Sequence, residues 1–161
     1  MKTVSIVVLL FVGFGFGMLV EKQTAAKHMT DKLNRLEANE KLVVDFYDKS
    51  FNKKDLSAAD TYIDENYIQH NPAVRTGRKG FVEGVGAMLK KSPNMKMNLK
   101  HVFADGDFVI THVWMQINSA DPKDRGLAIV DLFRVNNGKI AEHWDVIQPI
   151  PVKSANDNGM F

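Results

Sequence analysis

The 161-residue chain contains no cysteine. This absence excludes disulfide bonds, thiolate metal sites, thiol nucleophiles and a lipid attached through sulfur, and it is compatible with an oxidising compartment. The chain also has no stripe of positive charge. Its 21 Lys and Arg are nearly balanced by 19 Asp and Glu, and the two signs are mixed along the sequence. A nucleic-acid-binding surface needs clustered basic residues, so we expect no nucleic-acid partner.

Long apolar runs are missing as well, with one exception at the N-terminus. Residues 4–20 carry no charge, follow Lys2, end at Glu21 and precede the small residues Thr24, Ala25 and Ala26. This pattern is typical of a secretory signal cleaved after Ala26, although the run is just long enough for an uncleaved membrane anchor. We therefore predict that residues 1–26 are a signal peptide or an anchor. The protein is then periplasmic or secreted, or held at the inner membrane by residues 4–20.

The remaining length and composition indicate one globular domain. Hydrophobic residues make up 45% of the chain and charged residues 25%, which is normal for a folded domain with its own core. We expect a polar linker at residues 27–38, the domain at residues 39–150 and a loose tail at residues 151–161. No internal repeat is present.

Three helices are predicted in the first half of the domain. The first begins at Asn39 and shows a stripe of helical spacing, formed by Val43, Phe46, Tyr47, Ser50 and Phe51. Asp55 is a suitable N-cap for a short second helix that reaches Tyr62. Residues 64–72 are expected to be a loop or a short extended piece that ends at Pro72. A third helix near Gly80 ends at Ser92-Pro93.

After Pro93 the hydrophobic period changes from 3.6 to 2, which predicts strands. Strands are expected at residues 95–103, 108–118, 126–135 and 139–150, with a hairpin signal at Asp105-Gly106. Helices followed by a four-strand meander indicate an α+β fold. We predict a curved antiparallel sheet wrapped around the N-terminal helices.

The first hairpin predicts one face that combines apolar residues with two histidines. A two-residue Asp105-Gly106 turn pairs Ala104 with Asp107 and fixes the strand register. The shared face then carries Met97, Leu99, His101, Phe103, Phe108, Ile110, His112 and Trp114.

The second hairpin has two possible registers. A two-residue Asn137-Gly138 loop sets Asp131 opposite Trp144 and turns His143 to the other face. A three-residue loop that starts at Asn136 sets Asp131 opposite His143 and gathers Asp145 on the same face. We favour the second register, because it also gives the oppositely charged Arg134 and Glu142 a common face.

Three stretches resemble the SnoaL-like polyketide cyclase family of the nuclear transport factor 2 superfamily. They are the helix at residues 39–51, YIQHNP at residues 67–72 and DLFRVNNGKIAEHWDVIQ at residues 131–148. The resemblance spans residues 39–150 and is strongest to the aldol-condensation or ester-cyclase subgroup. It implies a cone-shaped fold that encloses a pocket, a homodimer, and Asp131 as general acid/base with His70 and His143 in the pocket.

The resemblance and the residue types together predict cofactor-free acid/base chemistry. An aldol cyclisation or an isomerisation needs a base beside a carbonyl group and a donor for the developing enolate. We predict that Asp131, His143 and His70 are catalytic. The expected ligand is a small hydrophobic or aromatic carbonyl compound, contacted by His112, Trp114, Trp144, Tyr67 and Asp145.

Two other functions remain open at the level of the sequence. The same fold can serve as a non-catalytic module that binds a small ligand or a protein. Histidines at positions 70, 101, 112 and 143 are zinc-ligand types, together with Asp131, but no HxxxH-like spacing supports a metal site. We therefore predict neither a metal nor a cofactor.

Overall fold

A computed structural model describes residues 4–161, with side chains described from Val20 onward. The chain divides into two compact units, Met1–Arg35 and Leu36–Phe161. Within the described residues, no helix is long and apolar enough to cross a membrane. The predicted signal or anchor at residues 1–26 falls mostly on residues 1–19, whose side chains lie outside this description, and it stays a prediction.

The first helix, α1, spans Val4–Tyr47, so the predicted start at Asn39 is wrong. The expected linker at residues 27–38 is helical because it contains good helix formers and neither Gly nor Pro. Lys27 and Asp31 also pair across one turn, with 2.8 Å between Nζ and Oδ2. A short π-helix, η1, follows at Asp48–Asn52.

The predicted cap at Asp55 is confirmed, because its side chain accepts a hydrogen bond from the backbone N–H of Ser57. It begins the 3-10 helix η2 (Leu56–Ala58), which leads into α2 (Ala59–Tyr62). The third predicted helix is also confirmed as α3 (Arg78–Lys91).

The domain contains a five-stranded sheet in the order β1-β5-β4-β3-β2. The four strands of the predicted meander are β2 (Lys96–Asp105), β3 (Phe108–Gln116), β4 (Leu127–Asn136) and β5 (Lys139–Pro149). The fifth is β1 (Ile63–Gln69), where we expected a loop or a short extended piece. It pairs parallel to β5, whereas the other neighbours are antiparallel. The predicted α+β fold with a curved sheet is confirmed.

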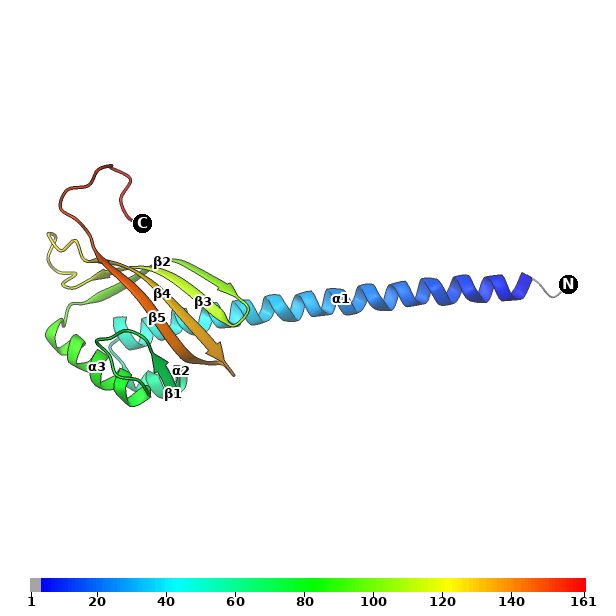
Figure 1. The fold of residues 1–161 in the computed structure, drawn as a ribbon, viewed down its shortest axis with the longest axis horizontal. Coiled ribbons are helices and arrows are strands. Elements are labelled where there is room, and N and C mark those ends of the chain that lie inside the picture. Colours follow the sequence, from blue (N-terminus) through cyan, green and yellow to red (C-terminus); the bar gives the residue numbers. More distant parts are fainter. Residues whose placement is uncertain (1–3) are drawn as a thin grey trace. The chain divides into compact units, whose positions relative to one another are not determined.

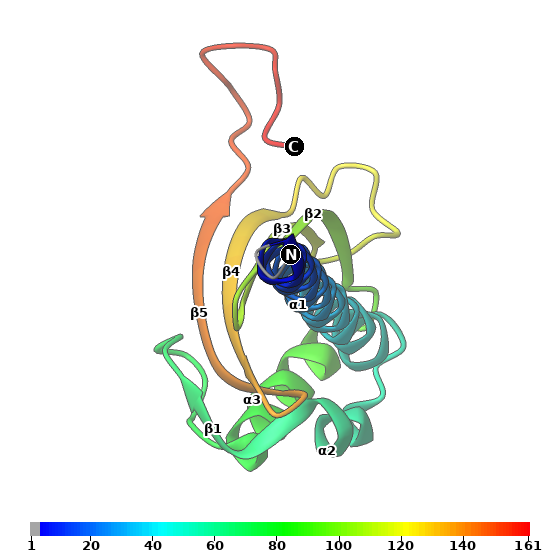
Figure 2. The same ribbon diagram turned by 90° about the vertical axis from the view of Figure 1, so that its right-hand side faces the viewer.

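The main core lies between the sheet and the helices. Phe46 in α1 makes edge contacts with Phe51 and Phe133, and its ring lies 5.4 Å from that of Phe81 in α3. Figure 1 shows the elements along the chain, and Figure 2 shows how strongly β4 and β5 bend. This bend gives the sheet an inner face, toward α1 and α3, and an outer face.

The predicted turn of the first hairpin is displaced by one residue, which shifts the pairing of its strands by two residues. Asp105 pairs with Phe108, so the two loop residues are Gly106 and Asp107, with Gly106 in the left-handed region (φ 58°). A β-bulge at Lys100 then reverses the faces along β2. Of the face that we predicted, only Met97 and Leu99 point inward. The others lie on the outer face: His101, Phe103, Phe108, Ile110, His112 and Trp114.

The second hairpin has the predicted face but a different turn. Its loop has two residues, Asn137 and Gly138, both in the left-handed region (φ 49° and 71°). A bulge at Ala141 adds one residue to β5, so Asp131 pairs with Asp145 and lies on the same face as His143. The extra residue restores the face that we expected from a three-residue loop.

Candidate functional site

A small cavity opens on the inner face of the sheet, between β4, β5 and α3. Its volume is about 120 Å³. Most of the wall is apolar, with Phe51, Phe81, Val85, Met88, Met97, Met115, Ile129 and Phe133 among the lining residues. The polar lining is limited to Tyr47, Tyr67, Gln69, Asn71, Asp131, His143 and Asp145. An apolar pocket with a few convergent polar groups is the usual form of a small-molecule site.

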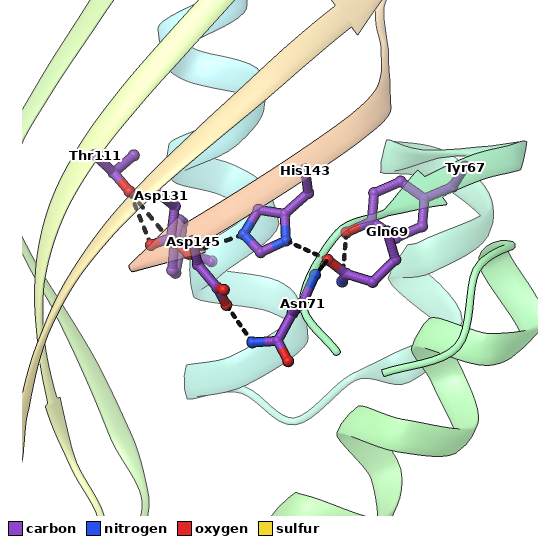
Figure 3. Close-up of polar contacts among 8 residues, drawn as sticks. Tyr67, Gln69, Asn71, Thr111, Asp131, His143 and Asp145 are labelled. Carbon is purple, nitrogen blue, oxygen red and sulfur yellow. Dashed lines mark hydrogen bonds and ion pairs between the residues drawn. The ribbon is translucent and has the colours of Figure 1, made fainter. Parts of the chain in front are cut away.

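Asp131 is buried, with 6% of its surface exposed, and hydrogen bonds compensate its lost hydration. The Tyr47 hydroxyl donates to Oδ2 at 2.5 Å, and the Thr111 hydroxyl donates to the same oxygen at 3.2 Å. Oδ1 lies 2.9 Å from Nε2 of His143. Both oxygens of this carboxyl group are therefore engaged (Figure 3).

His143 bridges Asp131 and Gln69. Its Nδ1 lies 2.9 Å from Oε1 of Gln69, which also accepts a hydrogen bond from the backbone N–H of Asn71. A backbone N–H can only donate, so the atom facing it must be the amide oxygen of Gln69. An amide oxygen can only accept, and Nδ1 of His143 therefore carries a hydrogen. The other ring nitrogen, Nε2, faces the acid.

One further proton lies between His143 and Asp131. Without it, two lone pairs would face each other across 2.9 Å. The pair is therefore either an imidazolium with a carboxylate or a neutral imidazole with a carboxylic acid. Moving one proton along this hydrogen bond interconverts the two forms.

Asp145 supplies a second carboxylate that is less engaged. Its Oδ2 accepts a hydrogen bond of 2.6 Å from Nδ2 of Asn71, whose own oxygen is fixed by the backbone N–H of Ala73. Oδ1 of Asp145 has no hydrogen-bond partner among residues 20–161. This oxygen is the carboxylate atom of the cavity that is best placed to accept a proton from a ligand.

Two tyrosines at the cavity stay protonated. Burial, followed by the charge of Asp131, raises the pKa of Tyr47 well above its ordinary value. Burial and the charges of Asp131 and Asp145 likewise raise the pKa of Tyr67. Both hydroxyl groups therefore act as hydrogen-bond donors over the whole physiological pH range.

Four of the residues that we predicted for the site lie together at the cavity: Asp131, His143, Asp145 and Tyr67. His70 does not. Its side chain is 41% exposed, its ring stacks on that of Trp144, and its Nε2 lies 2.9 Å from Oε1 of Glu142. Glu142 also accepts a hydrogen bond from Arg134, and these two partners lower the pKa of Glu142. His70 is thus part of a group of surface side chains that also contains Trp144, Glu142 and Arg134.

The other predicted ligand contacts lie on the outer face of the sheet. His112 and Trp114 are adjacent to the C-terminal Phe161 ring, at centroid distances of 5.1 and 6.1 Å. Trp144 covers His70 on the same side. Along β3 the side chains of Val109, Thr111, Val113 and Met115 are buried on the inner face, so the alternate residues His112 and Trp114 point outward. The bulge at Lys100 puts them on the opposite face from Met97 and Leu99, with which we had grouped them.

Three polar residues that line the cavity were not identified from the sequence: Tyr47, Gln69 and Asn71. Thr111, which donates a hydrogen bond to Asp131, was not identified either. Tyr47 was assigned to the apolar stripe of a helix and Thr111 to a strand. Gln69 and Asn71 do lie within the YIQHNP motif, where we selected the histidine between them. An extended backbone at residues 69–71 turns Gln69 and Asn71 to one side and His70 to the other.

Among the residues whose side chains are described, one group could hold a cation: Asp131, His143 and Asp145, whose ligand atoms lie within 4.8 Å of one another. The donor set fits poorly, because Nε2 of His143 and Oδ1 of Asp131 already bond to each other. The zinc cluster considered from the sequence is not assembled. His101 and His112 pair on the outer face, with 3.3 Å between their Nδ1 atoms, away from His143.

The sequence matches one family model, described as SnoaL-like polyketide cyclase, over residues 41–155. The match includes every residue at the cavity. The comparison with proteins of curated function finds no match.

Solved structures with the same fold include two from Streptomyces. A loop-truncation variant of IdmH from Streptomyces antibioticus is 19% identical, with a TM-score of 0.61 over 68% of this chain and 91% of that one. TsrD from Streptomyces laurentii is also 19% identical, with a TM-score of 0.59 over 69% of this chain and 88% of that one. At this identity the likeness shows the fold alone.

Proposed function

The chain belongs to the SnoaL-like polyketide cyclase family, and from this premise we propose that it catalyses cofactor-free proton transfer beside the carbonyl group of a small, largely apolar compound. Such a step begins an aldol cyclisation or an isomerisation. The observation that carries the proposal is that two features meet at one apolar cavity. They are the hydrogen bond between Asp131 and His143 and an oxygen of Asp145 without a hydrogen-bond partner among residues 20–161.

The hydrogen bonds divide the roles between the two carboxyl groups. Both oxygens of Asp131 are held by hydrogen bonds, Oδ2 with Tyr47 and Thr111 and Oδ1 with His143. Asp145 lines the cavity and has one oxygen without a hydrogen-bond partner among residues 20–161. We therefore assign proton removal from carbon to Asp145. The Asp131–His143 pair holds the proton that compensates the charge of the site.

The cavity limits the substrate to a small molecule. A volume of about 120 Å³ is comparable with an engineered protein cavity of about 150 Å³ that binds benzene. The reacting part of the ligand is therefore about the size of one six-membered ring. Its surface must be largely apolar, because most of the lining residues are apolar.

The proposal can be tested before the natural substrate is known. Proton removal beside a carbonyl group exchanges the α-hydrogens of a ketone for deuterium in D₂O. We expect the protein to accelerate this exchange in cyclohexanone or acetophenone, measured by proton NMR. Asp145→Asn should slow the exchange by about 100-fold or more, since general base catalysis contributes about 10²–10⁴.

The matched control is Asp45→Asn. Asp45 is a surface carboxylate that pairs with Lys41 one turn away, and its replacement should leave the exchange rate unchanged. If the wild-type protein binds these ketones without exchanging them, it is a binding module of the same fold and the catalytic proposal is wrong.

A further inference from the structure

The orientation of the Gln69 amide group determines the direction of its hydrogen bonds with His143 and Tyr67. The backbone N–H of Asn71 donates to its oxygen at 2.9 Å, so the amide nitrogen must point the other way, toward Tyr67. That nitrogen lies 2.9 Å from the Tyr67 hydroxyl (Figure 3). An amide NH₂ group can only donate, so the oxygen of Tyr67 accepts this bond.

The hydroxyl hydrogen of Tyr67 is therefore not used by Gln69. No acceptor for it is found among residues 20–161, although the Tyr67 residue is only 2% exposed and lines the cavity. A buried donor without a protein partner is costly unless a ligand or water meets it. The position of the ring is fixed by packing, because it contacts Phe81 edge-on at a centroid distance of 6.3 Å.

We propose that the Tyr67 hydroxyl donates the hydrogen bond that stabilises the developing enolate oxygen of the substrate, and that Gln69 is the positioning residue that turns this hydroxyl toward the cavity. This inference rests on the proposed function. It adds a catalytic donor to the base already assigned, and it replaces the histidines as donor, because both nitrogens of His143 are engaged.

The protons and electrons of enolate formation are all accounted for within the site. Oδ1 of Asp145 takes the α-proton, the C–H electron pair forms the carbon–carbon double bond, and the carbonyl π electrons move to oxygen. Tyr67 keeps its proton and holds the oxygen by a hydrogen bond. Return of a proton to carbon reverses the flow, so no oxidant or other reactant is needed. A fixed donor is most effective where charge develops in a dry site.

The first test is Tyr67→Phe in the ketone exchange assay. The ring and its packing remain, so the protein should fold and should bind cyclohexanone within about 3-fold of the wild-type affinity. The exchange rate should fall by about 100-fold, the usual cost of removing one oxyanion donor. The control is Tyr62→Phe, a half-buried tyrosine outside the cavity, which should exchange at the wild-type rate.

The second test is Gln69→Glu, which separates positioning from packing. One carboxylate oxygen still accepts from Nδ1 of His143, whereas the other takes the place of the amide nitrogen and accepts the Tyr67 hydrogen. The ¹⁵N NMR shifts of His143 should still report a protonated Nδ1, while exchange should be as slow as in Tyr67→Phe. Exchange at the wild-type rate in either variant would overturn the inference.

The outcomes also distinguish this inference from the function beneath it. If Asp145→Asn abolishes exchange and Tyr67→Phe does not, the donor is elsewhere and the proposed function stands. If the wild-type protein exchanges no ketone, both proposals are wrong.

Discussion

Asp131 shows how a single buried carboxyl group is accommodated in a strand of apolar residues. Its neighbours in sequence, Val130 and Leu132, point to the opposite face, while three donors from three elements converge on it. Hydrogen bonds to a charged group contribute about 1.5–3 kcal/mol each, which offsets the cost of burial. The sequence indicated that compensation was needed, but it did not show where the donors came from.

Tyr47→Phe tests this compensation. The variant keeps the ring but leaves Oδ2 of Asp131 with Thr111 as its remaining donor. We expect the free energy of unfolding at pH 7 to fall by about 1.5–3 kcal/mol, measured by urea denaturation. Tyr62→Phe is again the control and should change stability much less. Equal effects of the two variants would show that the bond to Asp131 contributes nothing specific.

At the residue scale, three of the residues that we predicted for the site lie together at the cavity. We chose Asp131, His143 and Asp145 because burying ionisable side chains in an apolar strand is costly unless other groups compensate. Gln69 and Asn71 were missed because amides carry no charge to mark them. We assigned His70 to the site because it lies in the QHNP motif. Its side chain instead points outward and stacks on Trp144.

At the scale of elements, two β-bulges determine what each strand presents to the cavity. The bulge at Lys100 reverses the faces of β2, and the bulge at Ala141 brings His143 to the inner face of β5. Hydrophobic patterns located the helices and the meander, because burial imposes their periods. A bulge adds one residue without changing composition, so the patterns did not reveal it. At β1 the sequence left open whether the segment is a loop or an extended piece, because its seven residues show no clean alternation.

Two glycines test the backbone just before β3 and just before β4. Gly106 and Gly126 are both left-handed, with φ of 58° and 72°. A Cβ at Gly106 meets nothing within 4 Å, whereas one at Gly126 collides with the carbonyl oxygen of Met115. Gly106→Ala should therefore cost only the left-handed strain, about 1–2 kcal/mol. Gly126→Ala should cost clearly more, as measured by thermal unfolding. Similar losses of stability in the two variants would contradict the close approach of Gly126 to the carbonyl oxygen of Met115.

At the scale of the whole molecule, the site belongs entirely to the second unit, Leu36–Phe161. The first buried residue of the described chain is Asn39, and the family model begins at residue 41. The predicted domain start at residue 39 lies close to both. Residues 20–35 are helical, and all of them are exposed. They add no buried side chain to the fold.

Deleting residues 1–35 should therefore leave the domain intact. We expect the shortened protein to unfold at the same temperature as the full chain and to exchange ketone α-hydrogens at the same rate. Calorimetry and the NMR assay check the two expectations. A marked fall in the unfolding temperature would show that the first unit stabilises the domain.

The central claim is that Asp145 removes a proton from carbon beside the shared proton of Asp131 and His143. The most direct measurement is the rate of deuterium incorporation into cyclohexanone by the wild-type protein and by Asp145→Asn, at equal occupancy of the ligand. The account predicts exchange by the wild-type protein and a loss of about 100-fold or more in the variant. Equal rates in the two proteins would contradict it.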